Sequence, residues 1–118
     1  MNGEIERAEW ESFIDEFSKR TAGRNARVEI FSEELGAQVD AEMIPLEGVA
    51  FGRKGSLASS LEIMLGGGSD RHLTHTVEKV KRILPKVGTD GREDALEIEA
   101  EEGTKTIIIF ETSPQLSA

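Results

Sequence analysis

The sequence contains no cysteine among its 118 residues, and this absence excludes several kinds of chemistry. Disulfide bonds, thiolate zinc sites, iron–sulfur clusters and cysteine nucleophiles all require a thiol. The chain also has no apolar run approaching the roughly 18 residues that a membrane-spanning helix needs. Residues 1–4 carry neither the basic flank nor the apolar stretch of a signal peptide. We therefore expect a soluble cytoplasmic protein with no membrane partner.

Basic residues are in the minority as well. The 23 aspartates and glutamates outnumber the 14 lysines and arginines, which gives a formal net charge of −9. Non-specific binding of nucleic acid depends largely on basic side chains that neutralise phosphates, so this balance argues against nucleic acid as a partner. The length is that of a single domain, which we expect to span residues 1–118.

Apolar side chains at helical spacing predict one helix near the N-terminus, from about residue 7 to residue 22. They recur at positions i, i+3, i+4 and i+7, on one face of an amphipathic helix. These residues are Trp10, Phe13, Ile14 and Phe17. Gly23 follows at a position where a left-handed residue would end the helix. Because three of the six Phe and Trp side chains lie on this stripe, we expect the helix to pack on an apolar surface.

Beyond Gly23, apolar and polar residues alternate with a period of two, which predicts strands over residues 26–111. Short turns separate these strands, so we expect an antiparallel sheet of six or seven strands. Ile44-Pro45 is expected to end one strand, because proline cannot donate to the ladder. The predicted fold class is α+β, one N-terminal helix packed on a strongly curved sheet that can close into a small barrel. Residues 112–118 are expected to fray.

The stretch over residues 71–87 alternates less regularly. Its apolar residues lie in one phase before Glu78 and in the opposite phase after it. One straight strand cannot bury both sets, so we expect a strand with a bulge or bend near Glu78. A short helix over residues 77–84 is the competing interpretation, because the apolar residues there also fit helical spacing.

Charge is distributed unevenly towards the C-terminus. Residues 71–87 carry +4, whereas residues 90–102 carry −6. Antiparallel pairing of the two segments would set opposite charges side by side on a solvent-exposed face. The residues expected to face each other are Lys79, Lys81, Glu97 and Glu99. The alternative is a basic patch that binds an acidic partner or a phosphate.

The two histidines, His72 and His75, mark the candidate ligand site. On a helix this i, i+3 pair would share a face, but on a strand the two side chains point to opposite faces and do not hold one metal ion together. We expect ordinary hydrogen-bonded or surface histidines, with no metal and no cofactor. The candidate ligand-binding residues are His72, His75, Asp70, Arg71 and Lys81.

Six short motifs, spread over most of the chain, form a recognisable set. They are Trp10-Glu11-Ser12-Phe13, Gly36-Ala37-Gln38-Val39, Pro45-Leu46-Glu47-Gly48, Ile63-Met64-Leu65-Gly66, His72-Leu73-Thr74-His75 and Ala95-Leu96-Glu97-Ile98-Glu99. With this set the chain, from Trp10 to Phe110, resembles a small bacterial family of uncharacterised proteins known as a domain of unknown function. The resemblance implies a soluble, single-domain bacterial protein and supplies no activity and no site residue.

No nucleophile elbow or other catalytic motif is recognisable, so the sequence favours a protein that is not an enzyme. The leading hypothesis is a non-catalytic binding or regulatory module that acts through protein–protein contact or self-association, because edge strands of a small β-rich body can pair with another chain. The second hypothesis is a protein that binds a small anionic ligand or a metal, or a minor enzyme, with its site near His72 and His75. The third is an acidic structural protein without a discrete site.

Overall fold

The computed structural model contains one α-helix and seven strands in the part of the chain that it describes. That part comprises residues 3–52, 60–66, 72–88, 91 and 93–111, with the side chains of residues 40–42 excepted. The elements in chain order are η1 (Arg7–Glu9), α1 (Trp10–Thr21), β1 (Asn25–Ser32), β2 (Gly36–Phe51), β3 (Leu61–Leu65), β4 (Leu73–Val77), β5 (Val80–Val87), β6 (Glu93–Ala100) and β7 (Lys105–Phe110). No helix among these has the length and apolar character needed to cross a membrane.

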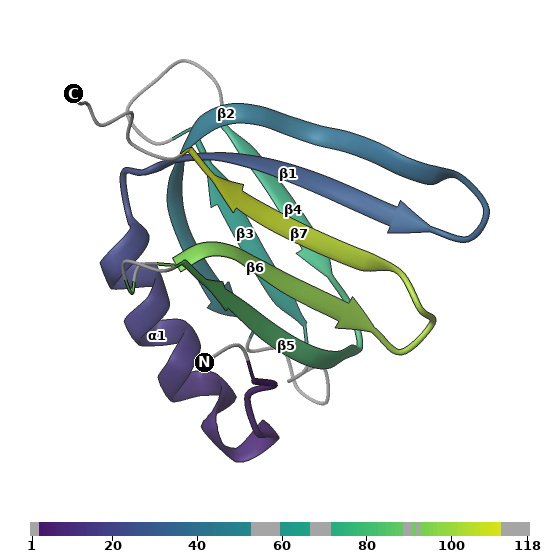
Figure 1. The fold of residues 1–118 in the computed structure, drawn as a ribbon, viewed down its shortest axis with the longest axis horizontal. Helices are drawn as coiled ribbons and strands as arrows, with labels where there is room; N and C mark the ends of the chain where they lie inside the picture. The colour runs from purple at the N-terminus through teal and green to yellow at the C-terminus, as the bar shows by residue number, and fades with distance from the viewer. Residues whose placement is uncertain (1–2, 53–59, 67–71, 89–90, 92, 112–118) are drawn as a thin grey trace.

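The seven strands form one antiparallel sheet in the order β4-β3-β2-β1-β7-β6-β5. The sheet bends over itself, so that β3, β4 and the second half of β2 lie across β1, β7, β6 and β5 (Figure 1). This confirms the predicted fold class, an N-terminal helix packed on a curved antiparallel sheet. The sheet does not close into a barrel, because β4 and β5 remain as two separate edges.

The long strand β2 makes the bend. The prediction that Ile44-Pro45 ends a strand is wrong, because β2 continues through both residues to Phe51. Instead, β2 changes partners there: its pairing with β1 ends at Pro45, and its pairing with β3 begins at Leu46. Proline lacks a backbone N–H, and here it lies at the place where one ladder gives way to the other. The backbone of Met43 has a φ of 42°, which adds to the curvature of β2.

The irregular stretch before Gly88 is not a short helix, and it is two strands instead of the single bent strand that was predicted, with the break at the predicted place near Glu78. β4 ends at Val77 and β5 begins at Val80, with Lys79 in the left-handed region at a φ of 57°. A register shift between Val80 and Arg82 adds a bulge. The two-residue connection therefore links the two opposite edges of the sheet at this point.

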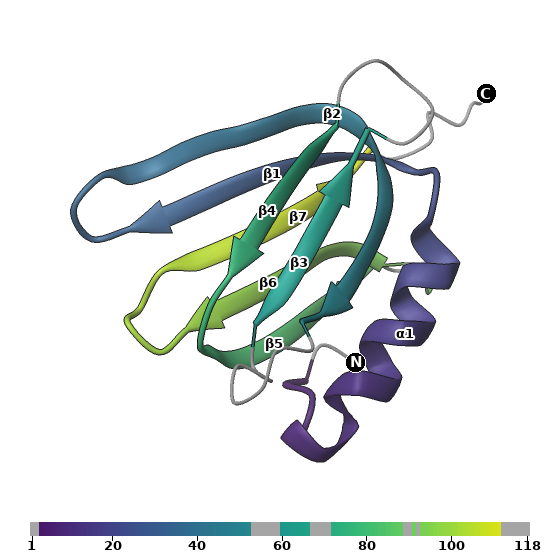
Figure 2. The same cartoon turned by 180° about the vertical axis from the view of Figure 1, so that it is seen from behind.

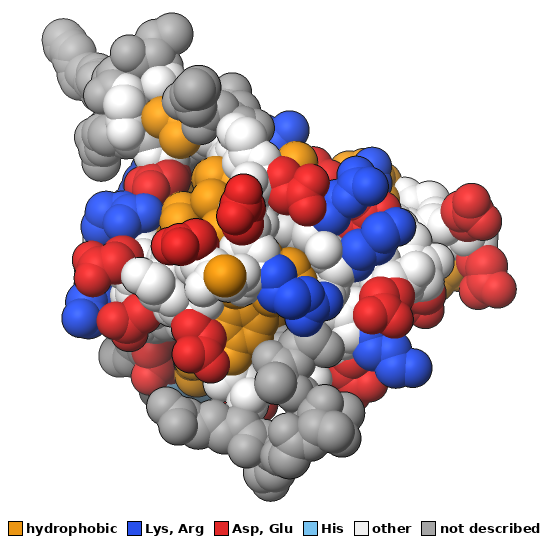
Figure 3. Space-filling view, turned by 90° about the horizontal axis from the view of Figure 1, so that it is seen from below, with side chains coloured by type: hydrophobic (Ala, Val, Ile, Leu, Met, Phe, Trp, Pro, Cys, Tyr) orange, Lys and Arg blue, Asp and Glu red, His pale blue; other side chains and the backbone are white. Residues whose placement is uncertain are grey.

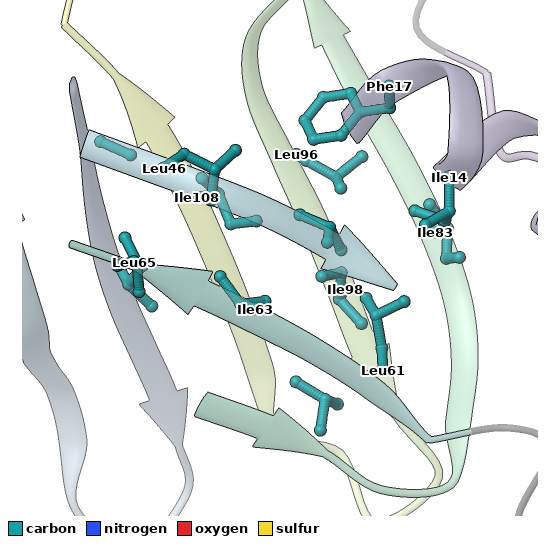
Figure 4. Packing of buried hydrophobic residues seen from close by; sticks show 14 of the residues in the cluster. Ile14, Phe17, Leu46, Leu61, Ile63, Leu65, Ile83, Leu96, Ile98 and Ile108 are labelled. Atoms are coloured by element: carbon teal, nitrogen blue, oxygen red, sulfur yellow. The ribbon is translucent and has the colours of Figure 1, made fainter. Parts of the chain in front are cut away.

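The helix α1 covers one side of the space between the two layers, and the β1–β2 and β6–β7 turns lie at the opposite side (Figures 1 and 2). Its buried face contains Trp10, Ile14 and Phe17 from the predicted stripe, while Phe13 is half-buried. Gly23, at a φ of +90°, follows the helix as predicted. The core between the layers is aliphatic (Figure 4). It includes Leu46, Leu61, Ile63, Leu65, Ile83, Leu96, Ile98 and Ile108.

One hydrogen bond ties α1 to the sheet and supports a stability prediction. The backbone N–H of Val49 donates to the Ser18 hydroxyl at 3.0 Å. Ser18→Ala leaves this N–H without a partner beside a buried side chain, so we expect the free energy of unfolding to fall by about 1–3 kcal/mol. Ser12→Ala, at an exposed position of the same helix, is the matched control. Equal urea midpoints for the two variants would contradict the role given to Ser18.

Candidate functional site

A cavity of about 440 Å³ opens between the two layers on the side opposite α1. One wall is the C-terminal part of β4 with the β4–β5 connection, and the other is formed by β1, β6, β7 and the β6–β7 turn. The residues that line it are Ile30, His75, Thr76, Val77, Glu78, Lys79, Ala100, Glu102, Thr104 and Thr106. Glu78, Lys79 and Glu102 lie in the two turns together with Thr104, whereas the other lining residues come from the strands.

The two histidines occupy different surroundings. His75 is half-buried and lines the cavity. On β3 it is paired with Ile63, which is fully buried. His72 precedes β4, is exposed, and has its Nδ1 4.0 Å from the carboxylate of Glu47 on β2. The strand interpretation predicted different surroundings for the two, since successive residues of a strand, and therefore residues three apart, point to opposite faces. In the chain as described, no cluster of three or more His, Asp or Glu side chains has a geometry that could hold a metal ion.

Among the described residues, no second candidate lines the cavity with His75. Asp70 and Arg71 lie outside the described residues. Lys81 is exposed on β5, next to the bulge that follows Val80, and it does not line the cavity. Of the three candidates that the structure describes, His75 lines the cavity, and His72 and Lys81 do not.

The basic segment and the acidic segment do form ion pairs across β5 and β6, but with other lysines and arginines than predicted. Arg82 pairs with Glu99 at 3.9 Å, and Lys86 pairs with Glu97 at 3.8 Å. The prediction that Lys79 and Lys81 face these glutamates is wrong, because the bulge after Val80 shifts the register by one residue. On the surface shown in Figure 3, basic side chains lie among acidic ones. The segment is thus not a continuous basic patch.

Thr106 is the feature of the cavity that sequence reasoning missed. The described part of the chain has two buried polar residues, Thr21 and Thr106, which are 0% and 1% exposed. The Thr21 hydroxyl donates to the Phe17 carbonyl at 2.7 Å. The Thr106 hydroxyl has no hydrogen-bond partner among the described residues, and the side chain lines the cavity. Buried polar groups normally have a partner, so this wall is suited to a ligand with a polar atom. The sequence signal was a threonine in the inward phase of an otherwise apolar strand.

The two edges of the sheet differ in how they are protected. On the β5 edge, the N–H of Ile5 donates to the Ile83 carbonyl at 2.9 Å, and Pro85 removes one donor. β4 pairs with β3 on one side, and it is the last strand of the sheet on that edge. β4 contains neither proline nor a charged residue between Leu73 and Val77. Its outer side therefore presents backbone donors and acceptors that an added strand could pair with.

The hairpin formed by β1 and β2 extends beyond β4. In Figure 2, β4 is the outermost strand of the front layer, and the hairpin projects past it from the layer behind. The hairpin carries the large apolar side chains that are exposed in the described structure. They are Phe31, Leu35, Val39 and Met43. The outer edge of β4, the cavity and the hairpin thus lie at one side of the molecule.

Comparison with known proteins identifies relatives without a described activity. A family model described as a family of unknown function, DUF5335, matches residues 1–118. An uncharacterised protein of Aquifex aeolicus (strain VF5) is 27% identical over 104 residues, which cover 88% of this chain and 86% of that protein. No solved structure matches the chain. The resemblance noted in the sequence, to a bacterial family of unknown function, is confirmed.

Proposed function

We propose that this chain, which belongs to the DUF5335 family of unknown function, is a non-catalytic protein-binding module that takes up an extended segment of a partner protein along β4. The difference between the two sheet edges carries the proposal. The β5 edge is covered by Ile5 and interrupted by Pro85, whereas the β4 edge has neither protection in the described structure. Natural sheets normally protect exposed edges, and an unprotected edge is a common docking place for an extended peptide.

The surroundings of β4 suit a single strand. A segment paired with β4 would lie about 4.8 Å from it, and so above the cavity and the inner side of the hairpin. Main-chain hydrogen bonds would supply affinity, and a side chain directed into the cavity would supply selectivity. Because the hairpin projects past β4, a lone extended segment fits this place better than the folded body of a second copy.

The ligand hypothesis centred on both histidines has less support. His72 is exposed and lies beside Glu47, whereas His75 is half-buried and lines the cavity, which argues against one site formed by both. The proposed module would act in the cytoplasm, a reducing compartment where disulfide bonds are rare. The chain has no cysteine, so its stability does not depend on disulfide bonds.

Binding of peptides that are N-methylated at single backbone nitrogens distinguishes strand addition along β4 from other ways of binding a peptide. We expect a library of random decapeptides to yield binders whose affinity falls about five- to tenfold per N-methyl group at alternate backbone nitrogens, because each methyl removes one main-chain hydrogen bond. Methylation at the intervening nitrogens should have little effect, since these point away from β4. In hydrogen exchange, the bound peptide should protect amides of β4 and none of β5.

Three outcomes would refute the proposal. These are selected peptides that tolerate N-methylation everywhere, protection confined to another surface, and protection of β4 that rises with protein concentration in the absence of peptide. The last outcome would assign the β4 edge to self-association.

A further inference from the structure

We propose that the segment bound along β4 carries a lysine or arginine whose side chain enters the cavity and meets the Thr106 hydroxyl and the carboxylates of Glu78 and Glu102. This inference rests on the proposed function and names the chemistry of the partner. Its starting point is Thr106, a buried hydroxyl without a partner that faces the cavity. A group with several N–H donors can satisfy it, and both basic side chains provide such donors.

The charge around the cavity selects a cation. The lining contains two acidic residues, Glu78 and Glu102. Its basic residues are Lys79 and the histidine His75. Glu101 is adjacent in sequence to Glu102 and is exposed. An acidic rim of this kind raises the local concentration of cationic groups and repels anionic ones.

The two carboxylates come from different turns that the fold brings together. Glu78 lies in the connection between β4 and β5, and Glu102 lies in the turn between β6 and β7. The N–H of Glu101 donates to the Lys79 carbonyl at 2.8 Å, which joins the two turns directly. A basic side chain that enters the cavity would therefore find both glutamates and Thr106 among the residues that line it.

Paired peptides test the charge requirement. For a selected peptide, replacing its basic residue with norleucine keeps a long unbranched side chain and removes the charge. We expect about tenfold weaker binding to the unmodified protein in isothermal titration, because a hydrogen-bonded charge is lost. With Glu78→Gln/Glu102→Gln, the two peptides should bind equally, and Thr106→Val should reduce the preference for the basic peptide severalfold. Glu101→Gln, which removes one negative charge beside the cavity, should preserve the preference.

Failure of this inference is distinguishable from failure of the proposed function. If the selected peptides have no basic residue in common, or if norleucine binds as tightly, the inference is overturned while alternate N-methyl sensitivity still supports strand addition. If Glu101→Gln abolishes the preference as fully as the double variant does, general surface charge and not the cavity is responsible. That result would overturn the inference as well.

Discussion

Replacing Phe17 with alanine is expected to lower the free energy of unfolding by about 3–5 kcal/mol, because it removes a large, fully buried ring. The Phe17 side chain is 0% exposed. Its ring centroid lies 5.8 Å from that of Phe13 on the same helix and 5.8 Å from that of Phe110 at the end of β7. Phe17 therefore connects the helix to the larger layer, and its loss leaves a cavity that rigid neighbouring strands cannot fill.

The control for Phe17→Ala is Phe13→Ala, one turn earlier on the same helix. Phe13 is half-buried and stacks on one side of Phe17, so its removal opens a space that solvent can fill and should cost clearly less. Urea unfolding followed by circular dichroism measures both, and an unchanged dependence on urea would show that the unfolded states are comparable. Equal losses for the two variants would show that the helix packs less specifically than its burial indicates.

The position of Phe17 is among the features that the sequence predicted well. Helical spacing of Trp10, Ile14 and Phe17 is a local signal, because residues three and four apart share a face whatever the helix packs on. Strand alternation in β3, β6 and β7 is local in the same way. These patterns sufficed for the helix and for the antiparallel arrangement of the sheet.

Features that depend on distant partners were harder to predict. Pro45 indicated the end of a strand, since proline cannot donate to a ladder, but the strand continues because β2 exchanges β1 for β3 at this residue. The bulge after Val80 likewise determines that Arg82 and not Lys81 faces Glu99. A bulge of one residue leaves little trace in the alternation of a short strand.

The cavity shows the same limit more strongly. His75 was a candidate because histidine is chemically conspicuous, but its neighbours Ile30 and Thr106 come from β1 and β7, far away in the sequence. Their proximity follows from the bend of the sheet, which no local pattern encodes. The unprotected edge of β4 could not be assigned either, because the order of strands decides which of them are edges.

Trp10→Ala is expected to have a stability loss of similar size, about 3–5 kcal/mol, and a second effect on association. The Trp10 ring is 5% exposed and stacks on Phe51 at 5.9 Å between centroids, with Arg7 4.5 Å from the ring centre. Its Nε1–H donates to the Ile5 carbonyl at 3.0 Å. The N–H of that same Ile5 donates to Ile83 and covers the β5 edge.

Loss of the indole should therefore expose the protected edge of the sheet as well as weaken the core. We expect faster hydrogen exchange of the Ile5 amide in Trp10→Ala, and concentration-dependent association in sedimentation velocity, because an exposed edge can pair with another chain. Trp10→Phe isolates the hydrogen bond: it keeps an aromatic ring against Phe51 and should cost about 1 kcal/mol, the net contribution of one hydrogen bond. If Trp10→Ala stays monomeric while its Ile5 amide exchanges freely, then Pro85 alone protects the β5 edge. In that case the contrast between the edges would rest on sequence composition and not on the covering segment.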